Sequence, residues 1–274
     1  MSSDAAPRAS IRRCTPEDEK QVRFIVGQAQ MEHLAFANNR AYFHPFTLAA
    51  WIAISSVFCQ YLGWWPDPSH GILGYISFLP AFFAPAVPIM FLIDWKNRPD
   101  VEARAEAVLR RVDMIDLAAY YVRSPASGLW LLEYGSKIIA LLALDASTDA
   151  TNDAPLDKNT PPSAQERTRL THGKGSSPVA TIRHFFAEEV YRGSGIEDDM
   201  LAFAVRTAFE QDPTVQSVRA VATPLVSTVR SSLIKMRFEA GEQDGKVGPF
   251  GWEYRWYTLE RAVWESTQAA SKSG

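Results

Sequence analysis

The residues best suited to chemistry lie between Val179 and Phe209, where a short apolar run is followed by glycines and then by a helical pattern. Val179 to Phe186 is apolar and partly β-branched, which predicts a strand, and apolar residues at helical spacing begin with Ile196. The loop between them contains Arg192, Gly193, Ser194 and Gly195. Glycines before a helix let backbone N–H groups approach an anion, so this turn is a candidate phosphate site. The alternative is that the glycines supply only backbone freedom.

The composition is that of a folded protein. The 274 residues are 47% hydrophobic and 22% charged, so the chain can bury a sizeable core. The net charge of −3 and a pI near 6.0 argue against nucleic acid as a partner. The two cysteines, Cys14 and Cys59, indicate neither a disulfide framework nor a zinc site, and we expect no metal.

The first ten residues are small and polar, and we expect a disordered tail at 1–10 with no signal peptide. Ile11 to Cys14 predicts a strand. Thr15, followed by a proline and two acids, predicts the start of a helix that runs to about Phe36. We assign 11–45 to the first part of the folded domain.

Two long segments, Phe46 to Trp65 and Gly71 to Trp95, carry almost no charge, and each approaches the roughly 20 residues that a membrane-spanning helix needs. The link, Pro66 to His70, has no Lys or Arg, whereas basic residues flank the pair at Arg40, Lys96, Arg98 and Arg104. We therefore expect a transmembrane helical hairpin at 46–95 with both ends in the cytoplasm. A buried hairpin of a soluble domain and a re-entrant second segment are the alternatives, since the second segment contains Pro80, Pro85 and Pro88.

The remainder of the domain is expected at 96–265. Its pattern predicts helices at 99–111, 113–121, 196–209 and 227–235. It predicts strands at 128–133, 138–144, 179–186, 215–222 and 252–259, with a further strand beginning at Phe238. Residues 146–178 lack an apolar period and are rich in turn formers, which predicts a long flexible loop. This order of elements predicts an α+β fold with one mixed central β-sheet flanked by helices.

Several of these segments together resemble the GNAT N-acetyltransferase superfamily. The resemblance is carried by the opening Ile11-Arg12-Arg13, the strand around Leu129-Trp130-Leu131, the loop Tyr191 to Ile196, and the closing Ser232 to Phe238. The hydrophobic hairpin after the first helix, followed by Asp113-Met114-Ile115-Asp116 and Tyr120, is similar to the membrane-anchored branch that contains N-acetylaspartate synthase and the cysteine-S-conjugate N-acetyltransferases. The resemblance implies a GNAT-like sheet with an inserted transmembrane hairpin.

The resemblance also implies acetyl-CoA as cosubstrate. Its pyrophosphate would be held by the backbone amides of Arg192, Gly193, Ser194, Gly195 and Ile196, and a backbone N–H near Phe186 and Ala187 would polarise the acetyl carbonyl. An amine would attack the thioester directly. The candidates for the base that takes the ammonium proton are His184, Glu188 and Glu189, of which His184 has the best-suited unperturbed pKa. The alternative is that His184 packs on the sheet and the glutamates are solvated.

Three positions depart from the family pattern. Glu197, together with Asp198 and Asp199, places carboxylates beside the predicted pyrophosphate. The tyrosine that protonates the leaving thiolate in many relatives is replaced by Leu233, and the glycine before Phe238 by Arg237.

The resemblance implies a membrane-anchored N-acetyltransferase acting on a small-molecule or peptide primary amine. Its catalytic domain would be cytoplasmic and its hairpin would lie in the lipid bilayer, with the endoplasmic reticulum as the expected membrane. The alternative is a catalytically degenerate GNAT-fold membrane protein acting as a binding or regulatory module.

Overall fold

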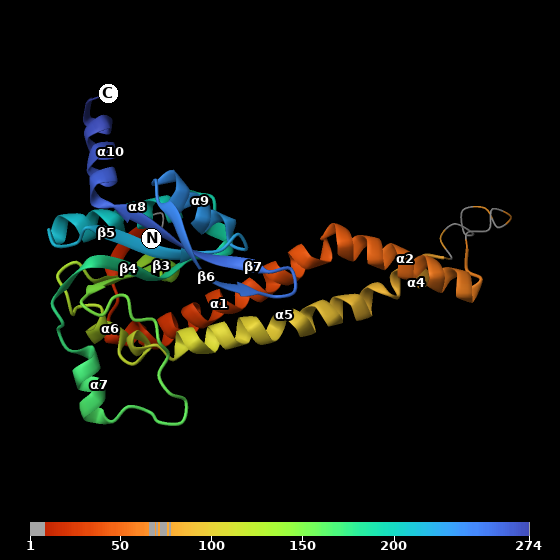
Figure 1. Ribbon diagram of the computed structural model, residues 1–274, viewed down its shortest axis with the longest axis horizontal. Helices are drawn as coiled ribbons and strands as arrows, with labels where there is room; N and C mark the ends of the chain where they lie inside the picture. Colours follow the sequence, from red (N-terminus) through yellow and green to blue (C-terminus); the bar gives the residue numbers. More distant parts are fainter. Residues whose placement is uncertain (1–8, 66–68, 70, 72–75, 77, 274) are drawn as a thin grey trace, which may run out of the picture. The chain divides into compact units, whose positions relative to one another are not determined.

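The protein forms two compact units (Figure 1). The computed structural model describes residues 9–65, 69, 71, 76 and 78–273. The first unit comprises Met1–Gln30, Arg104–Lys246 and Glu253–Gly274, and the second comprises Met31–Ala103 and Val247–Trp252. The predicted hairpin region therefore falls in a different unit from most of the sheet.

The first unit is built on a seven-stranded sheet with the strand order β1-β2-β3-β4-β5-β7-β6. The β4–β5 pair is parallel, while β1–β2, β2–β3, β3–β4 and β5–β7 are antiparallel. The predicted mixed α+β sheet is confirmed. The strands are β1 (Ala9–Arg13), β2 (Gly128–Tyr134), β3 (Lys137–Ser147), β4 (Ser176–Ala187), β5 (Ser217–Ala222), β6 (Glu239–Val247) and β7 (Trp252–Glu260).

Helices cover both faces of the sheet. One face packs against α8 (Ile196–Gln211) and α9 (Ser227–Lys235), in a cluster that includes Ile182, Leu201 and Leu233. The other face packs against the first part of α1 (Glu19–Tyr42), the turn η3 (Val112–Met114) and α6 (Leu117–Tyr120). Both faces of β3 and β4 are therefore buried, as expected of central strands with long apolar runs.

The chain enters α1 through a capped turn. The short 3₁₀ helix η1 (Pro16–Asp18) forms a capping box in which Asp18 accepts the Thr15 N–H at 2.8 Å. Arg12 then joins Asp18 to Glu133 on the neighbouring strand through two ion pairs. The predicted start of the helix is confirmed, but α1 ends at Tyr42, beyond the expected end near Phe36.

The second unit contains the apolar helices. These are α2 (Pro45–Leu62), α4 (Leu79–Phe83) and α5 (Ala86–Leu109). The His44 side chain accepts the N–H of Phe46 at the start of α2, and Gly63 ends it in the left-handed conformation. The stretches Pro45–Leu62 and Leu79–Leu109 are long and apolar enough to cross a membrane. The predicted link at 66–70 lies outside the described residues except for Ser69.

Polar side chains join α1 to α5 within this unit. Asn38 Nδ2 donates to Asp94 at 2.7 Å, and Asn97 Nδ2 donates to Asn38 at 2.8 Å. The expected separate helix at 99–111 is wrong, because α5 runs from the apolar segment through Pro99 to Leu109. Pro99 has no backbone N–H, so α5 continues through this position without the hydrogen bond to the Trp95 carbonyl.

The segment 146–178 has more structure than its composition predicts. It contains α7 (Ala164–Thr171), whose first turn is capped by the Ser163 hydroxyl. Arg183 donates to the carbonyls of Asp149, Ala150 and Asn152, and Leu156 donates its N–H to the Arg110 carbonyl. The prediction of an unstructured loop was wrong here because arginines from other elements supply the hydrogen bonds that the segment cannot make locally.

A terminal helix, α10 (Arg261–Ser273), was not predicted. Arg261 anchors it by donating to the carbonyls of Val215, Phe209 and Asp212. Val263 and Trp264 pack against the core that α8 covers. The helix therefore extends the same face of the sheet.

Candidate functional site

The parallel strands β4 and β5 part halfway along their length. They pair from Val179 with Ser217 to Ile182 with Ala220. Beyond this point β4 continues to Ala187 paired with β3, while β5 continues to Ala222 paired with β7. Beyond Ile182 and Ala220, the backbone N–H and C=O groups on the facing edges of β4 and β5 do not hydrogen-bond to each other. The split can therefore bind an extended polar ligand through main-chain hydrogen bonds.

The predicted glycine loop lies directly after this split. The turn η4 (Glu189–Tyr191) follows β4, and Gly195 forms the N-cap of α8, so the predicted helix start at Ile196 is confirmed. Gly193 and Gly195 have φ angles of 82° and 93°, which favour glycine strongly. A Cβ at either position would have no heavy atom within 4 Å outside its neighbours. The loop thus exposes open backbone before a helix N-terminus, where an anion is favoured.

Two other loop side chains support the loop itself. Arg192 Nε donates to the Ala187 carbonyl at 2.8 Å, and its guanidinium lies over the Phe186 ring. Ser194 Oγ donates to the Tyr191 carbonyl at 2.6 Å. Arg192 therefore links the loop to the end of β4, a role that the sequence pattern did not predict.

A pocket of about 210 Å³ lies beside the loop, between the start of α8 and the length of α9. Its lining is rich in hydroxyl groups and comprises Gly193, Gly195, Glu197, Asp198, Ser227, Thr228, Ser231, Ser232 and Lys235. This volume is small beside those of pockets that enclose whole drug-sized ligands, and it suits part of a ligand.

The three carboxylates at the start of α8 differ in their surroundings. Glu197 is only 3% exposed, and its Oε1 has no hydrogen-bond partner among the described residues. Asp198 pairs with Lys235 at 2.9 Å, and Asp199 is exposed to solvent. Of these three carboxylates, Glu197 is therefore the one that would oppose an anion bound at this loop.

The candidate bases lie in three different environments. Glu188 pairs with Lys137 near the surface, and Glu189 is exposed. His184 is 5% exposed, and its Nε2 lies 2.6 Å from Oδ2 of Asp113. The Tyr121 hydroxyl donates to the same oxygen at 2.7 Å. The sequence could not indicate this contact, because Asp113 and His184 are 71 residues apart.

A second polar cluster lies beside His184 on the same face of the sheet. The Asp145 carboxylate accepts from Arg183 at 3.0 Å, from the Tyr120 hydroxyl at 2.9 Å and from Arg123 at 3.3 Å. The side chains of Asp145, Arg123 and Arg183 are at most 1% exposed. Buried charges need such partners, so these residues stabilise one another.

Leu233, at the position of the expected thiolate acid, is fully buried in the core. It supplies no proton donor. Among the described residues no group of three or more His, Cys, Asp or Glu side chains is arranged to hold a metal ion.

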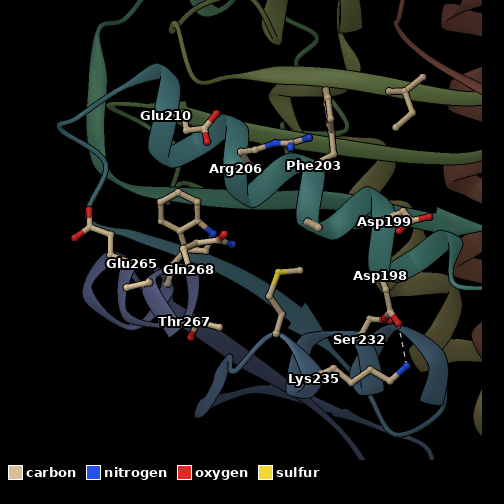
Figure 2. Close-up of a pocket in the computed structure, with 15 residues that line it drawn as sticks. Asp198, Asp199, Phe203, Arg206, Glu210, Ser232, Lys235, Glu265, Thr267 and Gln268 are labelled. Carbon is tan, nitrogen blue, oxygen red and sulfur yellow. Dashed lines mark hydrogen bonds and ion pairs between the residues drawn. The ribbon is translucent and has the colours of Figure 1, made fainter. Parts of the chain in front are cut away.

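A larger groove of about 1010 Å³ lies on the α8 face, between α8 and α10 (Figure 2). Figure 2 shows Arg206 and Glu210 of α8 on one side and Glu265 and Gln268 of α10 on another. Phe203, Met236 and Trp264 supply apolar lining. Its residues do not include those of the glycine loop.

No protein-family model matches the sequence, and no curated protein is significantly similar to it. Solved structures with a related arrangement include the aminoglycoside acetyltransferase AAC(6')-Ib in complex with coenzyme A, at 13% identity and a TM-score of 0.41 over 95% of this chain and 99% of that one. An acetyltransferase of the GNAT family from Streptococcus pneumoniae is 9% identical, with a TM-score of 0.45 over 92% and 99%. The putative acetyltransferase yncA from Salmonella typhimurium, solved with its cofactor acetyl-CoA, is 10% identical, with a TM-score of 0.41 over 92% and 93%.

Proposed function

We propose that this chain is a membrane-anchored N-acetyltransferase of the GNAT type, an acyltransferase that moves the acetyl group of acetyl-CoA to a primary amine. The observation that carries the proposal is the parting of β4 and β5 directly before a glycine loop and a helix N-terminus. The split can hold the extended amide-containing arm of coenzyme A, and the loop can hold its diphosphate. Both are bound mainly by backbone groups.

The residues proposed for the cosubstrate follow the path of the chain. Backbone N–H groups from Arg192 to Ile196 would bind the pyrophosphate, because the positive φ angles of Gly193 and Gly195 open the loop. A backbone N–H near Phe186 and Ala187, at the end of β4, would donate to the acetyl carbonyl and favour attack on its carbon.

Among the candidate bases, His184 is favoured by geometry. It lies two residues past Ile182, the last residue of β4 that pairs with β5, whereas Glu188 is engaged by Lys137. His184 would take the proton of the acceptor ammonium, and the free amine would attack the thioester. Because Leu233 cannot donate a proton, the leaving thiolate would be protonated by water.

The membrane anchor is proposed from α2, α4 and α5. Only 17% and 11% of their most apolar windows are buried inside the protein, so most of that surface is free to contact lipid. The basic flanks at Arg40, Lys96, Arg98 and Arg104 favour a cytoplasmic position for both ends of the hairpin, and the membrane is proposed to be the endoplasmic reticulum. A glycosylation tag at Ser69 should be modified in the lumen, and a cytoplasmic report from that tag would contradict the two-span arrangement.

One observation favours the second candidate, a degenerate GNAT-fold binding module. Glu197 lies buried in the pocket beside the loop, with an unpartnered oxygen. An ionised carboxylate there opposes a pyrophosphate. A module of this kind would keep the fold while having lost the turnover of acetyl-CoA.

The deciding experiment uses the full chain in detergent. Calorimetry should detect binding of coenzyme A, and free thiol should be released from acetyl-CoA when the right amine is supplied from a panel of amino acids, polyamines and peptides. Binding that appears only in Glu197→Ala would favour the degenerate module. The absence of binding in both proteins would remove the acetyltransferase proposal.

A further inference from the structure

A β-bulge in β4 sets the direction of His184. Ala143 pairs with His184 and Leu144 pairs with Ile182, so Arg183 has no partner of its own in β3. A bulge residue breaks the alternation of side chains along a strand. Arg183 and His184 consequently both reach the face covered by η3 and α6, where they meet Asp145 and Asp113.

Asp113 lies in η3, which packs against this face of the sheet. It is completely buried in the turn η3, and its Oδ2 accepts from Tyr121 and contacts His184, while Oδ1 has no partner among the described residues. Burial raises the pKa of Asp113, but the charge that His184 carries when protonated, the hydrogen bonds from His184 and Tyr121 and the charge of Arg183 outweigh it. The pKa of Asp113 therefore lies below its usual range, and the side chain remains a carboxylate.

A carboxylate can only accept hydrogen bonds. The His184 nitrogen that faces Asp113, Nε2, must therefore carry the hydrogen when the ring is neutral. In a neutral imidazole only one nitrogen is protonated, so the lone pair is left on Nδ1. The contact with Asp113 selects one of the two tautomers of His184.

We infer that Asp113 is a positioning residue, which holds His184 in the tautomer whose Nδ1 accepts the proton of the acceptor ammonium. This inference rests on the proposed function. When Nδ1 takes that proton, the amine nitrogen bonds to the acetyl carbon and the carbon–sulfur bond breaks. The thiolate receives a proton from water, the amide nitrogen loses one to water, and His184 later returns its proton to solvent. Asp113 holds the imidazolium by charge and keeps its own protonation state.

The groups around His184 determine which substitution tests the role of Asp113. Asp113 and Tyr121 contact it or its partner, Arg183 adjoins it in β4, and Tyr120, Asp145 and Arg123 form the neighbouring cluster. Among the residues that the structure describes, Asp113 alone is bonded to the ring through a carboxylate oxygen, at 2.6 Å. Asp113→Asn keeps the shape of the side chain and removes that charge.

Asp113→Asn should reduce kcat on the order of 100-fold, the scale of general-base catalysis, with little change in coenzyme A affinity. Tyr121→Phe is the matched control, since it removes the other donor to the same oxygen and leaves the carboxylate in place. Its kcat should fall far less than that of Asp113→Asn.

A second measurement does not depend on activity. Nitrogen NMR of the wild type at neutral pH should show His184 protonated at Nε2, and Asp113→Asn should shift the tautomer population. An active wild type whose Asp113→Asn variant keeps its kcat would overturn the inference, as would a neutral His184 ring protonated at Nδ1. Failure of the wild type to transfer acetyl to any amine, with the expected NMR result, would count against the proposed function and not against the positioning contact.

Discussion

The two faces of β4 are built from different chemistry. On the face toward α8, Ala180, Ile182 and Ala187 join an apolar core. The groups on this side that could bind a ligand are backbone N–H groups between the end of β4 and the start of α8. On the opposite face, Arg183 and His184 meet buried carboxylates. The difference teaches that the two sites we propose, one of backbone groups for a cosubstrate and one of side chains for proton transfer, would use opposite faces of one strand, because a bulge changes which face its residues reach.

If the two faces have different roles, substitutions on one face should leave the property of the other face unchanged. Changes to the polar face should alter stability or proton transfer while coenzyme A binding persists. Changes beside the glycine loop that keep its backbone conformation should alter coenzyme A binding while the free energy of unfolding changes little. Variants that affect both properties together would contradict the comparison.

The largest effect is expected from Asp145→Ala, because it leaves Arg123 and Arg183 buried without their shared counter-charge. Breaking such a pair should reduce the free energy of unfolding by about 3 to 5 kcal/mol. Denaturant unfolding measures this loss. Tyr120→Phe removes only one hydrogen bond to Asp145 and should cost about 1 kcal/mol. Equal losses in the two variants would show that the buried charges do not depend on Asp145.

Gly195→Val should weaken coenzyme A binding on the order of 100-fold, because several charge-assisted backbone hydrogen bonds are lost when the loop is distorted. Calorimetry measures the change. Gly175→Val is the control, since Gly175 also has a positive φ, 65°, but lies in the turn before β4. If both variants bind coenzyme A equally well, the loop is not the phosphate site.

Acid should destabilise the polar face through Asp149. Burial raises the pKa of Asp149, but Arg123, Ser147 and Lys174 lower it to about 2. A carboxyl group with a depressed pKa contributes stability above its unfolded value of about 4 and loses it as the pH falls to about 2. The loss should be up to about 2 kcal/mol. Asp149→Asn should flatten the pH dependence of unfolding in this window, and an unchanged slope would contradict the assignment.

The smallest effect is expected at Glu197. Glu197→Gln keeps the size of the side chain and removes its charge from the pocket beside the loop, so coenzyme A should bind about tenfold more tightly and with less dependence on salt. Asp199→Asn removes an exposed charge from the same helix and should change affinity less than about twofold. Weaker binding by the Gln variant would mean that Glu197 helps to hold the ligand.

Much of the fold could be predicted because its signals are local. The apolar run before Gly193 and Gly195 and the helical period from Ile196 predicted a strand, a loop and a helix, and the structure has all three. The two apolar segments predicted helices, which the described residues form, while their place in a membrane stays a prediction. The functions of His184, Glu188 and Glu189 also stay predictions.

Sequence alone determined many of the elements, such as the strand, loop and helix around Gly195, since helical period, capping residues and glycine conformation act within a few neighbouring residues. Only the tertiary structure decided that β4 and β5 part after Ile182, that Arg183 forms a bulge, and that Asp113 meets His184 from 71 residues away. It also decided that Arg183 holds the segment after β3 by three backbone carbonyls. Register and buried charge pairing depend on residues far apart in the chain, so no local pattern records them.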